Sequence, residues 1–210
     1  MIVEFKDMKP ASPFTACCKY AVFIHHSYSK INFLSREETE RLVREPVAGQ
    51  LAWDGLAVEQ VYKMTHGQPY LTQLICRAIV NRLNEFRKRN HAVIDDVDAA
   101  VEKVITQGAD HFSTHIWKEA SPKERMAMSA AADDITRGQL DFIGLNAFIE
   151  RIRTAAPGFT RKDCVEALDQ LVSKDVIHRK DTRYSFPVNL FRKWLAARHP
   201  LIQVREEVLD

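Results

Sequence analysis

Histidine side chains are the groups in this sequence best suited to binding a metal ion. His111 and His115 stand four residues apart on a segment expected to be helical, a spacing that brings two imidazoles to one helix face. No third ligand follows at a suitable spacing, so we interpret the pair as solvent-facing or junction histidines and predict no metal site. His25 and His26 are adjacent and would face opposite sides of a strand, so they predict no site either.

Four cysteines are present, and none belongs to a C-x-x-C pair: they are Cys17, Cys18, Cys76 and Cys164. Neither a zinc ribbon nor a thioredoxin-type redox pair is therefore expected. The sequence also lacks the features of a signal peptide, which favours reduced thiols in a cytoplasmic protein. Cys76 lies among apolar residues of an expected helix, where burial would raise its pKa and make the thiol unreactive.

The glycine pattern argues against catalysis by this chain alone. None of the seven glycines is followed by Lys, so the phosphate-binding motif G-x-x-x-x-G-K-[ST] is absent. The dinucleotide fingerprint G-x-G-x-x-G, the nucleophile elbow G-x-S-x-G and the zinc motif H-E-x-x-H are absent too. We therefore predict that the chain is not an enzyme, has no catalytic residues and binds no cofactor on its own.

Composition excludes several further classes of protein. Hydrophobic residues make up 46% of the 210 residues and charged residues 28%, which is typical of a globular protein. No apolar run reaches about 18 residues, so no membrane-spanning segment is expected. Thirty Lys and Arg against 28 Asp and Glu leave a net charge of +2, which is too balanced to imply a polyanionic partner.

The first half of the chain predicts a helical bundle over residues 35–118. A capping box at 35–38 begins the first helix. Asp54 can cap a second helix, Pro69 suits the first position of a third, and Asp95 can cap a fourth. The third helix has the clearest apolar face, with i, i+3, i+4 spacing, formed by Leu71, Leu74, Ile75, Ala78, Ile79, Leu83 and Phe86.

Residues 119–199 predict a winged helix. A capping box with Pro at the first helical position, residues 121–124, begins its first helix, and Thr160 can cap its third. A hairpin follows, in which Tyr184 and Phe186 alternate with polar residues as a half-buried strand requires. Three helices followed by a β-hairpin is the order of a winged helix.

The remaining segments are expected to be short. Residues 1–34 contain a strand-like apolar run at 20–24, and residues 200–210 form a C-terminal tail. Phe112 and Trp117 mark a short last helix of the bundle. The predicted fold class is therefore mainly α, with a helical bundle followed by a winged-helix domain that carries a small β-hairpin.

Residues 65–76, T-H-G-Q-P-Y-L-T-Q-L-I-C, resemble the T-G-G-x-P-Y-x-x-Q-x-x-C stretch in the helical lid of STAND-type, AAA-like P-loop ATPases. Segments 33–38, 95–97 and 121–125 and the closing stretch 184–195 are similar to further steps of that family in the same order. His66 departs from the pattern, because the family usually has Gly there. The family's P-loop lysine, magnesium-binding acidic residue and sensor strand have no counterpart.

The resemblance implies that this chain is the C-terminal part of such an ATPase, a lid and a winged helix without the nucleotide-binding core. Residues 1–34 would then be a remnant of the core or a linker from it. Removal of the core would leave apolar surface and strand edges near residues 20–34, and such surfaces favour self-association. The turn formed by Gly67, Gln68, Pro69 and Tyr70 would lie over the base and ribose of ATP or ADP, bound with magnesium by a P-loop domain. Without the resemblance, the same turn is simply a helix stop before a helix that begins with Pro.

The expected wing carries the best candidates for nucleic-acid contact, which are Arg179, Lys180 and Arg183. The third helix, residues 160–175, has three basic and four acidic residues, which argues against its insertion into a major groove lined by phosphates. The family resemblance implies that the winged helix more often serves as a docking surface for protein.

Two hypotheses follow. In the first, the chain is a non-catalytic regulatory or docking module, whose lid contacts nucleotide held by a P-loop domain and whose winged helix couples the nucleotide state to partner domains. In the alternative, it is a winged-helix nucleic-acid-binding protein with a supporting helical domain. The salt dependence of binding to duplex DNA distinguishes them, because phosphate contacts weaken steeply with salt.

Overall fold

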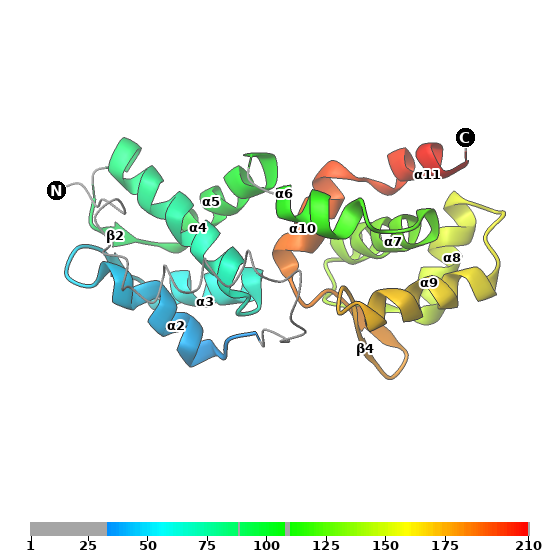
Figure 1. Cartoon of the computed structure of the whole chain (residues 1–210), viewed down its shortest axis with the longest axis horizontal. Coiled ribbons are helices and arrows are strands. Elements are labelled where there is room, and N and C mark those ends of the chain that lie inside the picture. The colour runs from blue at the N-terminus through cyan, green and yellow to red at the C-terminus, as the bar shows by residue number, and fades with distance from the viewer. Residues whose placement is uncertain (1–32, 88, 108–109, 210) are drawn as a thin grey trace. The chain divides into compact units, whose positions relative to one another are not determined.

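The computed structural model of the chain describes residues 33–87, 89–107 and 110–209, and it is mainly helical with a few short strands (Figure 1). The expected strand at 20–24, the two adjacent cysteines and the two adjacent histidines lie outside the described residues. The chain divides into two compact units, the first ending at Gln107 and the second beginning at Gly108.

The first unit is a small bundle of α-helices with one pair of two-residue strands. Its elements are α2 (Arg36–Arg44), a 3-10 turn (Glu45–Val47), β1 (Ala52–Trp53), α3 (Gly55–Thr65), α4 (Pro69–Arg82), a π-helical turn (Leu83–Arg87), β2 (His91–Ala92) and α5 (Ile94–Gln107).

The predicted helix starts of this unit are confirmed at α2, α3 and α4. The Ser35 hydroxyl accepts a hydrogen bond from the amide of Glu38, whose carboxylate accepts one from the amide of Ser35, so the capping box is complete. The Asp54 carboxylate accepts from the amide of Leu56 and caps α3. Helix α4 begins at Pro69, where the missing N–H costs no hydrogen bond.

Helix α4 is the central helix of the first unit, because it packs against α2, α3 and α5. Ile75 and Ile79 are fully buried, as predicted. Leu74 and Ala78 of the predicted face are only half-buried, Cys76 is buried as predicted, and Val80, which lies outside that face, is buried too. A helix enclosed on several sides buries more than one face, and the spacing pattern alone did not reveal this.

The start of α5 differs from the prediction. The helix begins at Ile94, one residue before the expected cap at Asp95. The capping carboxylate belongs to the fully buried Asp96, which accepts from the amide of Val93 at 3.0 Å and from the guanidinium of Arg89. The parallel pair of β1 and β2 just before α3 and α5 was not predicted, because two-residue strands have no periodicity to detect.

The second unit contains the winged helix and an additional C-terminal helix. Its elements are α6 (Asp110–Phe112), a π-helical turn (Ser113–Trp117), α7 (Pro122–Gly138), β3 (Ile143–Gly144), α8 (Leu145–Ala155), α9 (Arg161–Ser173), β4 (His178–Lys180), β5 (Arg183–Ser185), α10 (Asn189–Arg198) and α11 (Leu201–Leu209).

The winged-helix order is confirmed, since α7, α8 and α9 are followed by the antiparallel hairpin of β4 and β5. A third strand, β3, was not predicted. It pairs with β5, so that Ile143 lies opposite Tyr184 and the strand order is β3-β5-β4. The two predicted caps are present, because Ser121 and Thr160 each form a capping box with an acidic residue three positions later.

The described structure places the end of the first unit earlier than the sequence analysis did. Phe112 and Trp117, which we assigned to the bundle, pack with aromatic residues of α10: the ring centroids of Phe112 and Phe191 are 5.1 Å apart, and those of Trp117 and Trp194 are 6.4 Å apart. These contacts join the segment to the second unit, because its aromatic side chains are buried there.

The expected C-terminal tail is helical. Helix α11 packs on α7 through Leu201 and Val204, both buried. Helix α7 is therefore covered on most sides, and its residues from Met126 to Ala132 are all buried. An apolar stretch of this kind needs several neighbouring elements, and α11 supplies one of them.

Candidate functional site

The turn between α3 and α4 contains the four residues to which the sequence assigned nucleotide contact. Helix α3 ends at His66, which has a left-handed backbone conformation with φ of 51°. Gly67 follows with φ of 74° and is buried. Gln68 and Pro69 then begin α4, so the turn reverses the chain within four residues.

Gly67 is required in this turn by a close backbone contact. The amide of Leu34 donates a hydrogen bond of 2.8 Å to the carbonyl of Gly67. A Cβ atom on Gly67 would lie 2.0 Å from the carbonyl oxygen of Leu34, far inside contact distance. Only glycine combines this close approach with a positive φ at low cost. The entry segment at 33–35 is thereby held against the turn.

Two buried threonines form hydrogen bonds that stabilise the turn. Thr65 and Thr72 have fully buried side chains, and their hydroxyl oxygens are 3.1 Å apart. The Thr65 hydroxyl donates to the carbonyl of Val61 and accepts from the amide of Gly67. The Thr72 hydroxyl lies 2.9 Å from the carbonyl of Gln68. Because these polar groups are satisfied inside the unit, the turn is held in one conformation.

Gln68 uses its own side chain to cap α4. Its Oε1 atom accepts a hydrogen bond of 2.6 Å from the amide of Leu71. The carbonyl of Gln68 accepts from the amide of Thr72. The amide of Leu71, one of those expected to attract an anion at this helix start, is therefore already paired in the structure. An anion could use it only if the Gln68 side chain turned away.

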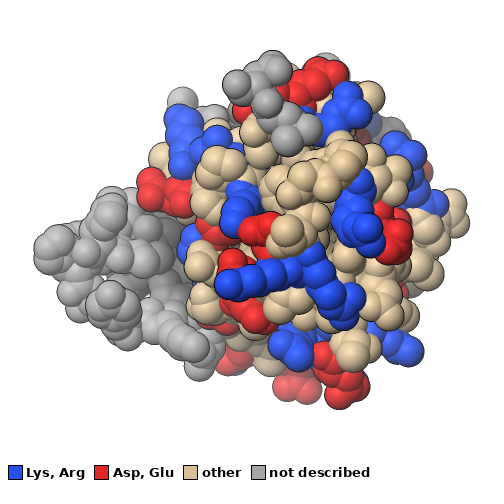
Figure 2. Space-filling model, turned by 90° about the vertical axis from the view of Figure 1, so that its right-hand side faces the viewer, with Lys and Arg blue, Asp and Glu red and all other residues tan. Residues whose placement is uncertain are grey.

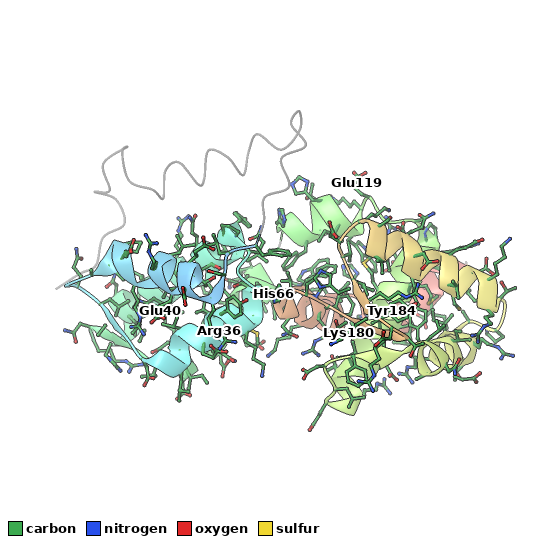
Figure 3. All side chains as sticks on the ribbon, turned by 90° about the horizontal axis from the view of Figure 1, so that it is seen from below. Arg36, Glu40, His66, Glu119, Lys180 and Tyr184 are labelled. Carbon is green, nitrogen blue, oxygen red and sulfur yellow. The ribbon has the colours of Figure 1, made fainter. Side chains whose placement is uncertain are left out.

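A small aromatic and basic cluster surrounds the exposed side of the turn. The rings of Phe33 and His66 meet edge to face at a centroid distance of 5.6 Å, and the Tyr62 ring lies 6.0 Å from that of His66. The Arg36 guanidinium lies 5.2 Å from the centre of the Tyr62 ring and 2.8 Å from the carboxylate of Glu59. Arg36 and His66 are labelled in Figure 3.

Leu34, Tyr62 and Thr72 also belong to this site, although no sequence motif predicted them there. The contact between Leu34 and the turn has no sequence signal, since it joins backbone atoms far apart in the chain. The only hint was the glycine itself, which commonly marks a close backbone approach.

The wing places its three predicted basic residues on one hairpin, and Lys180 is labelled there in Figure 3. Two of the three make contacts within the second unit. The Arg179 guanidinium lies 3.5 Å from the carboxylate of Asp169 and 5.9 Å from the centre of the Tyr184 ring. The Arg183 guanidinium lies 4.4 Å from the centre of the Phe142 ring. All three side chains remain exposed, so the wing retains basic groups at the surface.

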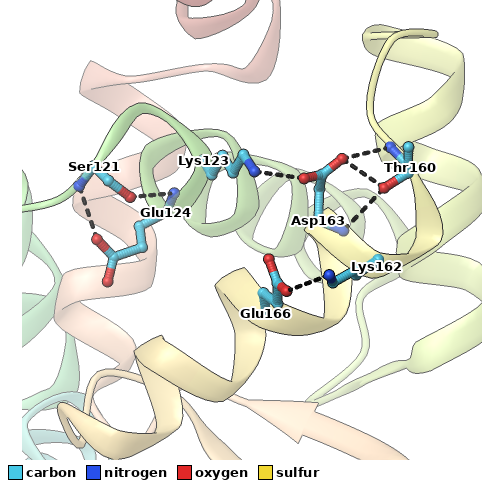
Figure 4. A network of polar contacts seen from close by, with 7 residues as sticks. All are labelled: Ser121, Lys123, Glu124, Thr160, Lys162, Asp163 and Glu166. Carbon is cyan, nitrogen blue, oxygen red and sulfur yellow. Dashed lines mark hydrogen bonds and ion pairs between the residues drawn. The ribbon is translucent and has the colours of Figure 1, made fainter.

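The first turn of α9, the third helix of the winged helix, is occupied by ionic and capping contacts (Figure 4). The carboxylate of Asp163 accepts from Lys123 of α7 and from both the amide and the hydroxyl of Thr160. The contact with Lys123 and the hydrogen bonds from Thr160 hold the pKa of Asp163 well below its usual value. Lys162 pairs with Glu166 on the same helix.

These contacts reduce the positive charge that α9 can present to a phosphate backbone. In Figure 2, which views the side of the second unit with α8 and α9, basic side chains have acidic ones beside them. The mixed surface matches the charge pattern found in the sequence. Helix α9 therefore has no strongly basic face with which to enter a DNA groove.

The described residues contain neither a three-ligand metal cluster nor a membrane-spanning helix. No group of three or more His, Cys, Asp or Glu side chains is arranged to hold a metal ion in the part of the chain that the structure describes. Within the same residues, no helix is both long and apolar enough to cross a membrane. The Cys76 thiol is buried, which raises its pKa to about 12 and agrees with its predicted place in the core.

Comparison with known proteins identifies no family. No protein-family model matches the sequence, and no curated protein matches it. Among solved structures, a structure of Drosophila ORC bound to DNA is similar with a TM-score of 0.35 and 17% sequence identity. The match covers 79% of this chain and 45% of that chain, so this chain spans less than half of its length. A likeness at this score carries no argument about function.

Proposed function

We propose that this chain is a regulatory and docking module without catalytic activity of its own, which works with a P-loop nucleotide-binding domain. The observation that carries the proposal is the backbone contact between Leu34 and Gly67. It joins the turn that resembles the nucleotide-facing turn of STAND-type ATPases to the segment through which the chain enters the first unit.

The contact supports a mechanical role for the turn. A domain attached to the segment at 33–35 would transmit its movement to the turn, because the amide of Leu34 and the ring of Phe33 both contact it. The paired Thr65 and Thr72 hydroxyls would pass that movement to α3 and α4 as rigid elements. Switching by rigid-body movement of packed helices is a common mechanism in such modules.

In this proposal, the second unit binds a protein partner rather than inserting a helix into a DNA groove. The first turn of α9 already has its acidic and basic groups paired, notably Asp163 with Lys123. Exposed ion pairs of this kind contribute little to binding a phosphate backbone, since their positive charge is partly neutralised. The winged helix would then couple the nucleotide state to partner domains.

The alternative function, nucleic-acid binding, is favoured by one observation. Arg179, Lys180 and Arg183 are all exposed on the wing, where they could contact phosphates without any contribution from α9. Contacts of that kind would be weak and indifferent to base sequence.

Site-specific photo-crosslinking tests the proposal. The photoreactive residue p-benzoylphenylalanine is placed at Tyr70, beside the turn, and in a matched variant at the exposed Glu102 of α5. Both variants are expressed in the cells that contain the protein, and crosslinks are compared with and without depletion of ATP.

We expect a crosslink from position 70 to a P-loop domain that depends on nucleotide, and no such crosslink from position 102. The P-loop domain is identified by mass spectrometry, whether it lies in a longer form of the same polypeptide or in a separate protein. Crosslinks that are identical at both positions, or that never include a P-loop domain, would contradict the proposal.

A further inference from the structure

His111 and His115 form a close pair at the start of the second unit. Their ring centroids are 5.1 Å apart and the rings are tilted by 51°. His115 is exposed and His111 is half-buried. The sequence predicts no metal site here, because no third ligand follows at a suitable spacing, and the described residues supply none, but the structure brings the two imidazoles together.

The helix that carries the pair has an unusual geometry. Residues Ser113–Trp117 form a π-helical turn, in which the amide of Lys118 donates to the carbonyl of Ser113 at 3.0 Å. His115 lies within this turn, and His111 lies in α6 directly before it. Single π-helical turns are frequent at functional sites.

The backbone on either side of the pair is anchored. Phe112 and Trp117 are 3% and 6% exposed, and both pack against the ring of Trp194. The two histidines therefore stand on a segment whose position is set by core packing. Binding of one ion by both histidines would therefore need little further ordering of this backbone segment.

We propose that His111 and His115 chelate a divalent transition-metal ion of the class that prefers imidazole, such as Ni²⁺, Cu²⁺ or Zn²⁺. The same i, i+4 spacing places two imidazoles on one zinc ion in the H-E-x-x-H motif. Imidazole nitrogen is a favoured ligand for these ions, and water completes the coordination where the protein supplies only two groups.

A neutral imidazole binds a metal ion through one ring nitrogen, and the other ring nitrogen can keep a hydrogen bond.

Isothermal titration of the full chain with Ni²⁺ tests the proposal. All proteins carry alanine at Cys17, Cys18, His25 and His26, which removes other metal-binding groups from the N-terminal segment. Two variants are compared on this background. His115→Ala removes an exposed ligand of the pair, and His91→Ala removes an exposed histidine of the first unit as a matched control.

We expect one site per chain, whose affinity falls more than about tenfold in His115→Ala and is unchanged in His91→Ala. Loss of a group that only supports a metal ligand already lowers affinity about 10- to 100-fold. In NMR spectra, Zn²⁺ should shift the ring signals of His111 and His115 together. Equal Ni²⁺ affinity of the parent and His115→Ala proteins, or ring signals that do not move with Zn²⁺, would overturn the proposal.

Discussion

The amide of Leu34 and the carbonyl of Gly67 are joined by a hydrogen bond of 2.8 Å, and the two residues approach so closely that no side chain fits on Gly67. This contact ties the entry of the first unit to the turn between α3 and α4. It explains why the turn has glycine at a position where the backbone has a positive φ.

Replacing this glycine should destabilise the first unit. Gly67→Ala introduces a Cβ that overlaps the Leu34 carbonyl and forces alanine into a left-handed conformation, which should cost at least about 2 kcal/mol. Gly55→Ala is the matched control, because a Cβ on Gly55 meets nothing within 4 Å. Urea unfolding measures both variants. Equal stability of the two variants would show that the entry segment does not hold the turn.

Side-chain truncation in α4 should cost more stability at buried positions than at half-buried ones. Ile79 is fully buried, so Ile79→Ala should cost about 2–5 kcal/mol through the cavity it leaves. Leu74 is only half-buried, and Leu74→Ala should cost distinctly less. The free energies of unfolding from urea titrations check this order. A larger cost at Leu74 than at Ile79 would contradict the packing of α4.

The stability of the second unit should fall in mildly acidic solution. Burial lowers the pKa of His199, whose ring stacks on that of Trp117 at 3.8 Å, below the ordinary value of 6.5. The unfolded chain then binds the proton more readily than the folded chain. The contribution of His199 is present above pH 6.5 and is lost as the pH falls through the lower pKa of the folded state.

Urea unfolding followed by tryptophan fluorescence at pH 7.5 and pH 5.5 measures this loss. His199→Asn, which does not titrate, should flatten the pH dependence in this range. Carboxylates titrate mostly below about pH 4.5, so they interfere little. An unchanged slope in the variant would rule out His199 as a source, and leave His111, whose pKa is also lowered by burial, as the group to replace next.

The three basic side chains of the wing should be dispensable for stability, and the protein should not bind DNA. Replacement of Arg179, Lys180 and Arg183 by alanine should change the free energy of unfolding by no more than about 1 kcal/mol, since exposed charges contribute little. Fluorescence anisotropy with labelled duplex DNA at about 0.15 M salt should show no measurable binding by the parent protein. Binding that the triple variant loses, with a salt slope reduced by nearly three, would favour the nucleic-acid alternative.

The purified chain should not hydrolyse ATP above background in the presence of magnesium. The motivation is the absence of a phosphate-binding loop and of any Gly-Lys dipeptide from the sequence. Release of inorganic phosphate, measured with repurified protein, checks this expectation. Turnover that follows the protein through successive columns would refute the proposed role as a non-catalytic module.

Local signals in the sequence predicted most helix starts and the order of the winged helix. Capping boxes and Pro at the first helical position involve residues within four positions of one another, so they can be recognised in the sequence alone. The caps at Ser35, Asp54, Ser121 and Thr160 are all present in the structure. The half-buried alternation of β5 was equally local, and Tyr184 is buried as expected.

Contacts between residues far apart in the chain could not be predicted from the sequence. The approach of Leu34 to Gly67, the pairing of β3 with β5 and the packing of Phe112 on α10 each join residues more than 30 positions apart. The sequence by itself determined where helices begin and which classes of enzyme motif are missing, because those depend on neighbours in the chain. Only the tertiary structure decided that α4 also buries Val80, that the turn between α3 and α4 is covered by Leu34 and that the imidazoles of His111 and His115 meet. These features depend on which surfaces pack together.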